Sequence, residues 1–510
     1  MKRILCLLLA VFLLCGCSLL GEEPYVPSGD ALIQDDDPTP TQPAQDTNQD
    51  ITLIYYADKT MNPFLSNDNT NRALFSLLYQ GLFQFDRSYQ VQPVLCKSYS
   101  VSKDMKTYTF YLENATFSDG TPVTAEDVVA SYQKAKSQAY YNGRFTYISS
   151  FSVTEDGGVQ VRTSIPMENL PLLLDIPVVP ADQVDADLPL GSGPYMLDTN
   201  GMHPLLRRTN WWSDAATTIN APAITLFQVK TSGQALSQIA DHFKFDGLDL
   251  VCVNPCADPY ADYMCDCELW SMENGNFLYL ACNSKSSLTT SGLRKALTYA
   301  INRDILATSY YRGFGIAANL PASPRFPHYS QALANSYAYN PEKFAEAVEA
   351  AGMTGRSITL LVNSQDSLRT QVALAIADML EAGGLKVTVS KKSGNNYSNA
   401  LRYGYYDLYL GQTKLSPNMD LSGFFSTYGG MNYGGLSNVT ALTLSKEAIA
   451  NHGNYYTLHQ TVMDEGFLCP ILFQSYGVFA TRGKLSFLTP ARDNVFYYST
   501  GKTMADALIK

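Results

Sequence analysis

The chain has 510 residues, which is too long for a single hydrophobic core, so two or three domains are expected. Hydrophobic residues make up 46% of it and charged residues 16%, so a large core can be buried. Acidic residues outnumber basic ones by 47 to 36, which argues against nucleic acid as a partner, because phosphate binding needs clustered Lys and Arg.

The N-terminus has the build of a lipoprotein leader. Two basic residues precede an apolar run over residues 4–14, which is too short to span a bilayer comfortably. Residues 14–17 then read LCGC, as a lipobox does, and Cys17 is predicted to receive a diacylglycerol thioether. Residues 1–17 are therefore predicted to be a signal peptide with its lipobox. An ordinary signal peptide with a chance cysteine is the alternative.

A polar tether is predicted after the leader, over residues 18–50. It is rich in Asp, Pro, Thr and Gln and has scarcely any apolar periodicity, so it cannot bury enough surface to offset its ordering entropy. We expect it to be disordered and to let a globular body reach away from the membrane. The acidic run at residues 35–37 is better explained as a solvated charge run than as a metal site.

The globular part begins with a buried strand over residues 51–56, followed by an apolar helix over residues 71–82. Alternating residues predict a half-buried strand ending at Leu112, and residues 118–122 then form a tight turn. A helix follows in which Thr124 is the N-cap and the acidic residue three positions on completes a capping box.

The second half of the chain alternates strands and helices. Asn340 and a proline after it open a helix that ends near Gly352. Strand, helix, strand and strand are then expected, in that order, over residues 358–362, 370–382, 385–389 and 407–410. This order predicts an α/β lobe.

Several motifs in chain order resemble those of the family 5 extracellular solute-binding proteins, the peptide and nickel receptors of ABC importers. The most specific is FSDGTPVTAEDV at residues 117–128, which follows the strand that ends at Leu112. Shorter matches occur across nearly all of the chain after residue 51. These are LYQGL at 78–82, GSGPY at 191–195, RTNWW at 208–212, GLDL at 247–250, LRKAL at 293–297 and INR at 301–303.

The resemblance implies an α/β fold of the periplasmic-binding-protein type 2 (class C), with two lobes, a hinge and an extra inserted domain. Lobe I would be discontinuous, and the inserted domain and lobe II would each be one segment. The implied ranges are 51–84, 190–279 and 475–510 for lobe I, 85–189 for the inserted domain and 280–474 for lobe II. Two strands near residues 278–282 and 473–479 would form the hinge, and ligand would close the lobes by binding the closed form better.

Peptide-binding members of the family hold the peptide amine with an Asp in a segment that often reads GWxxD. Counted from the YD that precedes this segment, Thr413 is at the Trp position and Ser416 at the Asp position, so the usual amine anchor is missing. Lys414 lies between them. A cation facing the cleft would repel a free amine and favour a carboxylate, whereas a solvent-facing Lys414 would do neither. The other candidate wall residues are Asn67, Asn69, Asn276, Phe277, Phe473 and Gln474.

Four cysteines lie within sixteen residues, at Cys252, Cys256, Cys265 and Cys267. Their spacing does not match a paired CxxC zinc site. Packed thiols, a disulfide among them and, less favoured, zinc remain as interpretations, and none would change the main function.

No catalytic motif is found. The five histidines are scattered, and Ser192 lies in GSGP, which is not a nucleophile elbow. We therefore expect no catalytic residue, metal or cofactor. The predicted function is a monomeric, lipid-anchored receptor on the outer face of the membrane, in the periplasmic space if the host has an outer membrane. It would capture oligopeptides or dipeptides for ABC permease subunits. A receptor for a glycan or nickel chelate, and a signalling or adhesion lipoprotein that kept the fold, are the alternatives.

Overall fold

The structure is a computed structural model that describes residues 50–198, 204–231, 235–245, 247–255, 260–286, 289–485 and 487–509. The predicted leader, its Cys17 and nearly all of the predicted tether lie outside the described residues. Within the ranges that are described, no helix is both long enough and apolar enough to cross a membrane.

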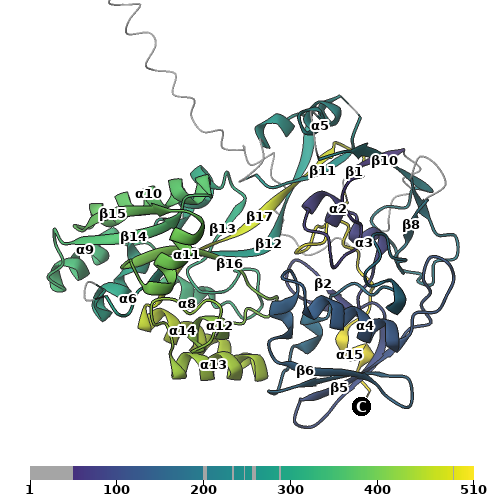
Figure 1. Cartoon of the computed structure of the whole chain (residues 1–510), viewed down its shortest axis with the longest axis horizontal. Coiled ribbons are helices and arrows are strands. Elements are labelled where there is room, and N and C mark those ends of the chain that lie inside the picture. Colours follow the sequence, from purple (N-terminus) through teal and green to yellow (C-terminus); the bar gives the residue numbers. More distant parts are fainter. Residues whose placement is uncertain are drawn as a thin grey trace, which may run out of the picture.

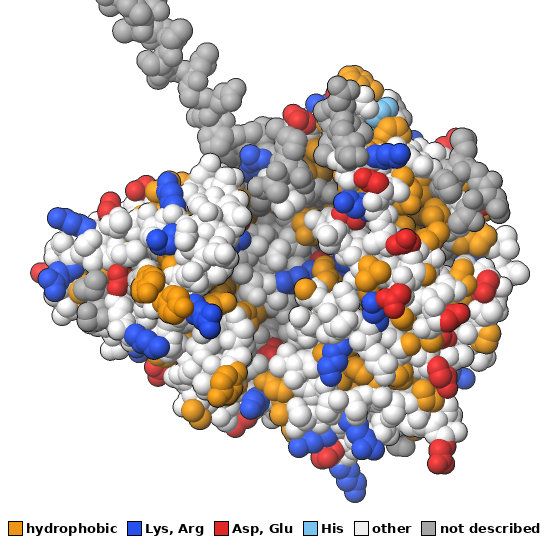
Figure 2. All heavy atoms as spheres, viewed as in Figure 1, with side chains coloured by type: hydrophobic (Ala, Val, Ile, Leu, Met, Phe, Trp, Pro, Cys, Tyr) orange, Lys and Arg blue, Asp and Glu red, His pale blue; other side chains and the backbone are white. Residues whose placement is uncertain are grey.

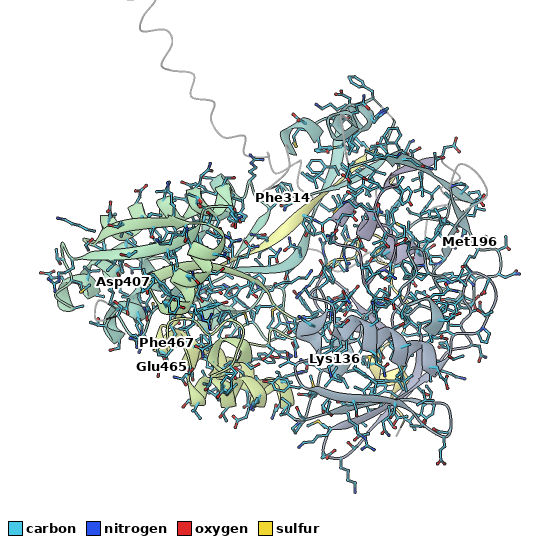
Figure 3. All side chains as sticks on the ribbon, in the orientation of Figure 1. Lys136, Met196, Phe314, Asp407, Glu465 and Phe467 are labelled. Atoms are coloured by element: carbon cyan, nitrogen blue, oxygen red, sulfur yellow. The ribbon has the colours of Figure 1, made fainter. Side chains whose placement is uncertain are left out.

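One sheet of eleven strands runs through the molecule, in the order β15-β14-β16-β12-β17-β11-β1-β10-β9-β8, with β13 paired to β17 (Figure 1). Its strands are β1 (Ile51–Tyr56), β8 (Tyr195–Leu197), β9 (Leu205–Arg207), β10 (Ala223–Val229), β11 (Leu250–Val253), β12 (Cys267–Cys282), β13 (Gly315–Ala317), β14 (Ser357–Asn363), β15 (Lys386–Lys392), β16 (Leu408–Lys414) and β17 (Leu468–Thr481). We call the part built on β1 and β8–β11 lobe I, and the part built on β14–β16 lobe II. In Figure 3 the labelled Met196 of β8 and Asp407, just before β16, lie in these two parts.

The long antiparallel strands β12 and β17 belong to both lobes. They pair from Cys267 to Glu273 on the lobe I side and from Phe277 to Ala281 on the lobe II side, with a register shift between the two stretches. Gly275 lies in that shift with a φ of +73°, where a side chain is strained, and a Cβ there would collide with the Arg492 guanidinium. The crossing of the two strands is therefore a local break in the sheet.

A separate four-stranded antiparallel sheet forms the inserted domain, in the order β4-β5-β7-β6. Its elements are β4 (Cys96–Val101), β5 (Thr107–Leu112), α4 (Ala125–Lys136), β6 (Ile148–Val153) and β7 (Val159–Thr163). A short hairpin of β2 (Phe83–Phe85) and β3 (Val91–Pro93) precedes it. The predicted capping box is confirmed at α4, where Thr124 accepts from the Asp127 N–H and Asp127 accepts from the Thr124 N–H.

The last residues of the chain, within the range 475–510 that the sequence assigned to lobe I, pack on this inserted sheet. Leu508 forms a bridge with Tyr99, and the Ile509 N–H donates to the Tyr99 carbonyl at 2.8 Å. Figure 1 shows the C-terminus beside β5 and β6, below α15 (Met504–Ala507).

Helices cover the lobe II half of the sheet. They are α6 (Ser291–Ala300), α7 (Arg303–Ile305), α8 (Gln331–Ser336), α9 (Pro341–Ala350), α10 (Ser367–Ala382), α11 (Gly394–Tyr403), α12 (Ser422–Phe425), α13 (Val439–Ala450) and α14 (Tyr455–Glu465). The predicted start of α9 is confirmed, because the Asn340 side chain accepts from the Lys343 N–H at 3.0 Å. The fully buried Phe344 and Val348 of this helix pack in the lobe II core. On the lobe I side, α5 (Ala235–Lys244) lies above β11 in Figure 1.

The helix predicted over residues 71–82 is wrong in its extent. The structure has two short helices instead, α2 (Asn69–Ala73) and α3 (Phe75–Leu78), and Tyr79 is extended. The reason is that the backbone beyond α3 bonds to other segments. The Leu78 carbonyl accepts from Gly193 N–H at 2.8 Å, and the Gln80 carbonyl accepts from Val178 N–H at 2.9 Å. Apolar periodicity alone could not reveal these long-range partners.

Candidate functional site: a charged cluster between the lobes

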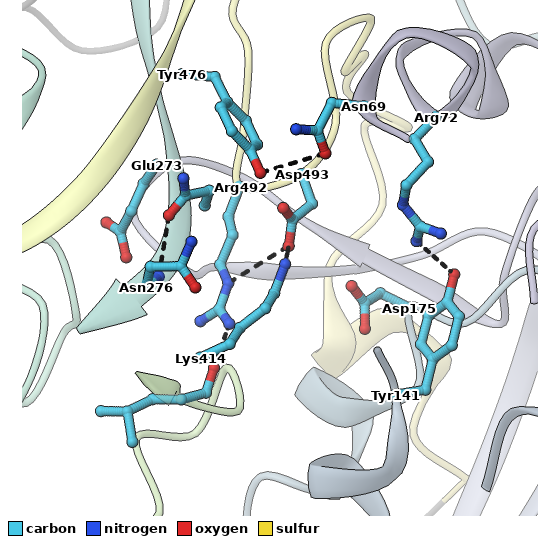
Figure 4. A network of polar contacts seen from close by, with 12 residues as sticks. Asn69, Arg72, Tyr141, Asp175, Glu273, Asn276, Lys414, Tyr476, Arg492 and Asp493 are labelled. Carbon is cyan, nitrogen blue, oxygen red and sulfur yellow. Dashed lines mark hydrogen bonds and ion pairs between the residues drawn. The ribbon is translucent and has the colours of Figure 1, made fainter. Parts of the chain in front are cut away.

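Lys414, at the end of β16, faces the space between the lobes. Its Nζ lies 2.7 Å from Oδ2 of Asp493, which belongs to the C-terminal segment, and 4.1 Å from the centre of the Tyr140 ring of the inserted domain (Figure 4). The Lys414 side chain is 26% exposed and that of Asp493 is 14% exposed. Lys414 is thus a cleft residue that already has an anionic partner from the opposite side.

Burial shapes the ionisation of this pair. It lowers the pKa of Lys414 to about 8, although Asp493 acts in the opposite direction. Burial also opposes ionisation of Asp493, but the charges of Lys414, Arg492 and Arg72 together hold the pKa of that carboxyl below its ordinary value. Near neutral pH the pair is therefore a buried ion pair with both groups charged.

Arg492 makes the second connection across the cleft. Its Nη2 donates to the carbonyl of Leu415, the residue after β16, and its Nε lies 3.8 Å from Oδ2 of Asp493. Arg492 is 5% exposed, and its Nε and Nη1 make no hydrogen bond of normal geometry, although the Tyr89 hydroxyl interacts with this guanidinium. Leu415 in turn donates its N–H to the Gly275 carbonyl at 3.0 Å. The Arg492 guanidinium therefore lies directly on the sheet break, and its Nε–H and Nη1–H groups could donate to a ligand.

The wall opposite Lys414 carries two further arginines. Arg72 of α2 donates from Nη2 to the Tyr141 hydroxyl at 3.1 Å and lies 3.5 Å above the centre of the Tyr140 ring. Arg144 forms an ion pair with Asp175. These residues, with Arg492 and Asp493, line a cavity of about 110 Å³.

The cluster as a whole is slightly cationic. Its cations are Arg72, Arg144, Lys414 and Arg492, and its carboxylates are Asp175, Asp493 and Glu273. The carboxylate of Glu273 is also held by two hydroxyl groups, from Tyr89 at 2.5 Å and from Ser323 at 2.7 Å. Figure 2 shows the surface hollowed between lobe II and the rest of the molecule, with Lys or Arg side chains in the hollow. Such a site suits a ligand that carries both an anionic and a cationic group.

The structure brings some of the other predicted residues to this cluster. Asn276 of β12 lies opposite Lys414 in the sheet register. Asn69 accepts at 3.2 Å from the hydroxyl of Tyr476, and both side chains lie beside Asp493 in Figure 4. Gln474 is 7% exposed and donates to Gln412 at 2.8 Å.

Other predicted residues lie outside the cluster. Phe277 and Phe473 are fully buried and stack on each other with ring centres 5.1 Å apart, so neither ring offers surface to a ligand in this conformation. The physical reason is that both occupy the paired strands of the crossing, where they fill the core. Ser416 is bonded to Asn418 at 2.7 Å, and Thr413 pairs with Phe277 in the sheet. Asn67 is exposed.

The sequence analysis missed Asp493, Arg492, Arg72, Arg144, Asp175 and Tyr140. A signal for the first two was present, because Arg492 and Asp493 are the charged residues of an otherwise largely apolar and aromatic stretch near the C-terminus. Charges in such a stretch are seldom buried without a function or a partner. Nothing in the sequence identified Lys414 as that partner.

No disulfide joins two of the described cysteines, and Cys267 is a buried thiol. Cys256, of the group of four noted in the sequence, lies outside the described residues. Burial raises the pKa of the Cys267 thiol to about 11, so this sulfur stays protonated at neutral pH. In the described part of the chain no three His, Cys, Asp or Glu side chains are placed to hold a metal ion.

Two lobes that share two crossing strands, with a buried polar cluster where they face each other, define a ligand-binding protein of the hinge-closing class. The chain belongs to the bacterial extracellular solute-binding proteins of family 5, since the model of the middle region of that family matches residues 90–435. The fold is accordingly the predicted type 2 periplasmic-binding-protein fold, and members of the family are extracytoplasmic solute-binding proteins of ABC importers.

Relatives and solved structures agree with this assignment. The chain is 26% identical to the glutathione-binding protein GsiB of Escherichia coli K12, over 65% of this chain and 67% of that protein. It is also 26% identical to the dipeptide-binding protein of the same strain, over 67% and 71%. The ABC transporter substrate-binding protein CtaP of Listeria monocytogenes shares the fold, with a TM-score of 0.70, 17% identity and coverage of 89% and 99%.

Proposed function

We propose that this protein is the substrate-binding component of a peptide importer, and that it captures dipeptides or oligopeptides by closing lobe II onto lobe I and the inserted domain. The observation that carries this proposal is the charged cluster, where Lys414, Asp493 and Arg492 meet at the sheet break. Relatives whose names specify glutathione and dipeptides support a peptide as the ligand class.

A peptide has the two charges that this cluster can pair. The Lys414 ammonium is paired with the Asp493 carboxylate at 2.7 Å, and a peptide's free ammonium group is chemically similar to it. A bound peptide would replace Lys414 at Asp493, while its carboxylate would accept from the Nε–H and Nη1–H groups of Arg492. Asp493 would thus bind the peptide's ammonium group from the opposite side of the cleft, whereas Ser416 has no carboxylate with which to bind it.

Lobe closure follows from the same contacts. A ligand that bridges the C-terminal segment and the end of β16 binds the closed arrangement better than an open one, and this difference in affinity shifts the equilibrium toward closure. The closed form would then be presented to the permease subunits. In this proposal the protein acts as a monomer by binding alone, without catalysis or a cofactor, and Cys17 holds it by a lipid anchor on the outer face of the membrane.

Thermal unfolding of the purified protein against a ligand panel tests the proposal. The panel contains di- to octapeptides, their N-acetylated forms, oligosaccharides and nickel chelates. A ligand at about a hundred times its Kd adds roughly 2.7 kcal/mol to the free energy of unfolding, which is readily visible. We expect free-amine peptides to stabilise the protein. Stabilisation by a glycan or chelate, with none by any peptide, would contradict a peptide receptor.

A further inference from the structure

A second and larger cavity lies where lobe II, the inserted domain and the C-terminal segment meet, and Tyr89, whose hydroxyl donates to Glu273 of the charged cluster, is part of its wall. It has a volume of about 760 Å³. Its walls come from residues 326–328 and His452 of lobe II, from residues 89–108 and 168–172, and from residues 502–508. Among the described residues that line the two cavities, none is shared. In Figure 1 α15, whose Met504 and Ala505 line the cavity, lies below the crossing of β12 and β17.

The walls of this cavity are mainly apolar and aromatic. Tyr89 and Phe326 meet edge to face across the junction, with ring centres 5.7 Å apart. Aliphatic side chains and further rings complete the lining, namely Val91, Tyr99, Val101, Met105, Tyr108, Leu172, Met504 and Leu508. A space of this size with such walls suits a small molecule that buries an apolar or aromatic group.

The charged groups at the rim already have partners. The Glu168 carboxylate accepts the His452 backbone N–H at 2.9 Å and lies 3.5 Å from Nδ1 of that ring. The Lys502 ammonium lies 2.6 Å from a carboxylate oxygen of Glu113. Burial lowers the pKa of both His328 and His452, so their rings are neutral at neutral pH. The described residues that line the cavity therefore offer no unpaired charge to a ligand, unlike the cluster around Asp493.

Asn169 lines this cavity, is 8% exposed and could make further hydrogen bonds through its side-chain amide. Neither its Nδ2 nor its Oδ1 makes a hydrogen bond of normal geometry. The Tyr455 hydroxyl is close enough to interact with the Asn169 side chain, but it donates to the Asn418 carbonyl at 2.6 Å. Nε2 of His452 is likewise buried without a partner. Leaving a buried amide unsatisfied destabilises the protein, and a ligand that offers both a donor and an acceptor would recover that free energy.

We propose that this cavity is a second binding site, which takes a neutral ligand that combines an aromatic group with an amide. The ring packs among Tyr89, Phe326 and Leu172, and the amide pairs with the Asn169 side chain. Because the walls belong to lobe II on one side and to the inserted domain and C-terminal segment on the other, an occupant stabilises the arrangement of lobes seen here. Binding in this cavity and binding at the charged cluster are then coupled, each raising affinity for the other ligand. The existence of this site is independent of what the cleft binds.

N-acetyl-L-phenylalaninamide, which is neutral and has a ring and two amides, serves as the probe, with calorimetric titration into the full-length protein in detergent. We expect saturable binding that falls at least tenfold in Asn169→Leu, whereas N-acetylglycinamide, which lacks the ring, does not bind. Met504→Trp narrows the cavity without touching the amide and should also abolish binding, so the result does not depend on one variant folding.

Three outcomes would overturn the proposal. These are no binding to the wild-type protein, undiminished binding to both Asn169→Leu and Met504→Trp, and loss of binding in Lys414→Met alone. The last would place the probe in the charged cleft. Failure of the peptide panel in the cleft is a separate result, because it leaves these titrations unchanged.

Discussion

Two of the places where lobe II meets the rest of the molecule differ in their chemistry. At the crossing of the long strands the contact is ionic, with Lys414 on Asp493 and Arg492 on the Leu415 carbonyl. Beside the second cavity the contact is mostly neutral. There Glu168 bonds through its N–H to the Ile449 carbonyl at 3.0 Å, and the rings of His328, His452 and Tyr455 stack behind it.

The difference shows which contact a ligand can take over. Breaking a buried ion pair leaves a charge that needs a new partner, so a ligand with its own charges competes for it directly. A neutral ring contact such as that of Tyr89 with Phe326 across the junction has no such demand, and it helps to hold lobe II in place by apolar burial. We therefore assign ligand recognition to the ionic contact and support of the lobe arrangement to the neutral one.

Asp493→Asn should break the ionic contact with the largest effect. It leaves the ammonium of Lys414 and the guanidinium of Arg492 buried without their carboxylate, and we expect the free energy of unfolding to fall by about 3 kcal/mol. Lys414→Met is the matched control and should cost only about 1 kcal/mol, because Asp493 keeps Arg492 at 3.8 Å. Urea denaturation measures both variants, and equal losses would contradict this asymmetry.

Gly275→Ala should displace the Arg492 guanidinium and so weaken the ionic contact. The φ of +73° disfavours any side chain, and the added Cβ would displace the Arg492 guanidinium. We expect a loss of about 2 kcal/mol in unfolding free energy and a larger radius of gyration in solution scattering, as the lobes separate. Gly292→Ala is the control, since a Cβ there meets nothing within 4 Å. Wild-type stability and size in Gly275→Ala would count against the sheet break as a hinge.

The lobe II core behind the neutral contact should lose stability as the pH falls. His459 of α14 is fully buried, and its pKa is lowered to about 3 by burial and by His328. The unfolded chain binds a proton at this histidine below about pH 6.5 and the folded chain does not, so stability falls as the pH falls. The contribution should be about 1.4 kcal/mol between pH 7.5 and 5.5. His459→Leu should remove it from pH-dependent urea curves, whereas His242→Gln, in lobe I, should not. Parallel pH profiles for His459→Leu and the wild type would contradict this origin.

Glu168→Gln should have the smallest effect on the free energy of unfolding, and it tests whether the contact at Glu168 is neutral. The side chain is 47% exposed, and the amide oxygen of Gln can still accept the His452 backbone N–H. We expect a change below about 1 kcal/mol in unfolding free energy, well under that of Asp493→Asn. A loss as large as that of Asp493→Asn would show that the contact at Glu168 is ionic in effect.

Local signals in the sequence were sufficient for much of the fold. The Thr124 capping box and the Asn340 cap each depend on residues three positions apart, and both were predicted correctly. The family motifs supplied the two-lobed architecture. The helix expected over residues 71–82 was wrong because its last residues bond to segments about a hundred positions away.

The candidate site was predictable only in part, for the same reason. Lys414 was singled out because it interrupts a known pattern, but its partner lies 79 residues further along the chain. Phe277 and Phe473 were placed on the cleft wall because they flank the hinge. When a strand is covered on both faces, its sequence does not show which side chains fill the core and which line the cleft. Both rings are in the core.

The central claim is that a peptide's ammonium group replaces Lys414 at Asp493. Calorimetric titration of the tightest-binding free-amine peptide, and of its N-acetylated form, into the wild type and Lys414→Met tests it most directly. Removing the competing ammonium should strengthen binding of the free-amine peptide about tenfold, or about 1.4 kcal/mol, and leave the acetylated form unchanged. Weaker binding of the free-amine peptide by Lys414→Met would contradict the claim, because Lys414 would then be a ligand contact rather than a competitor.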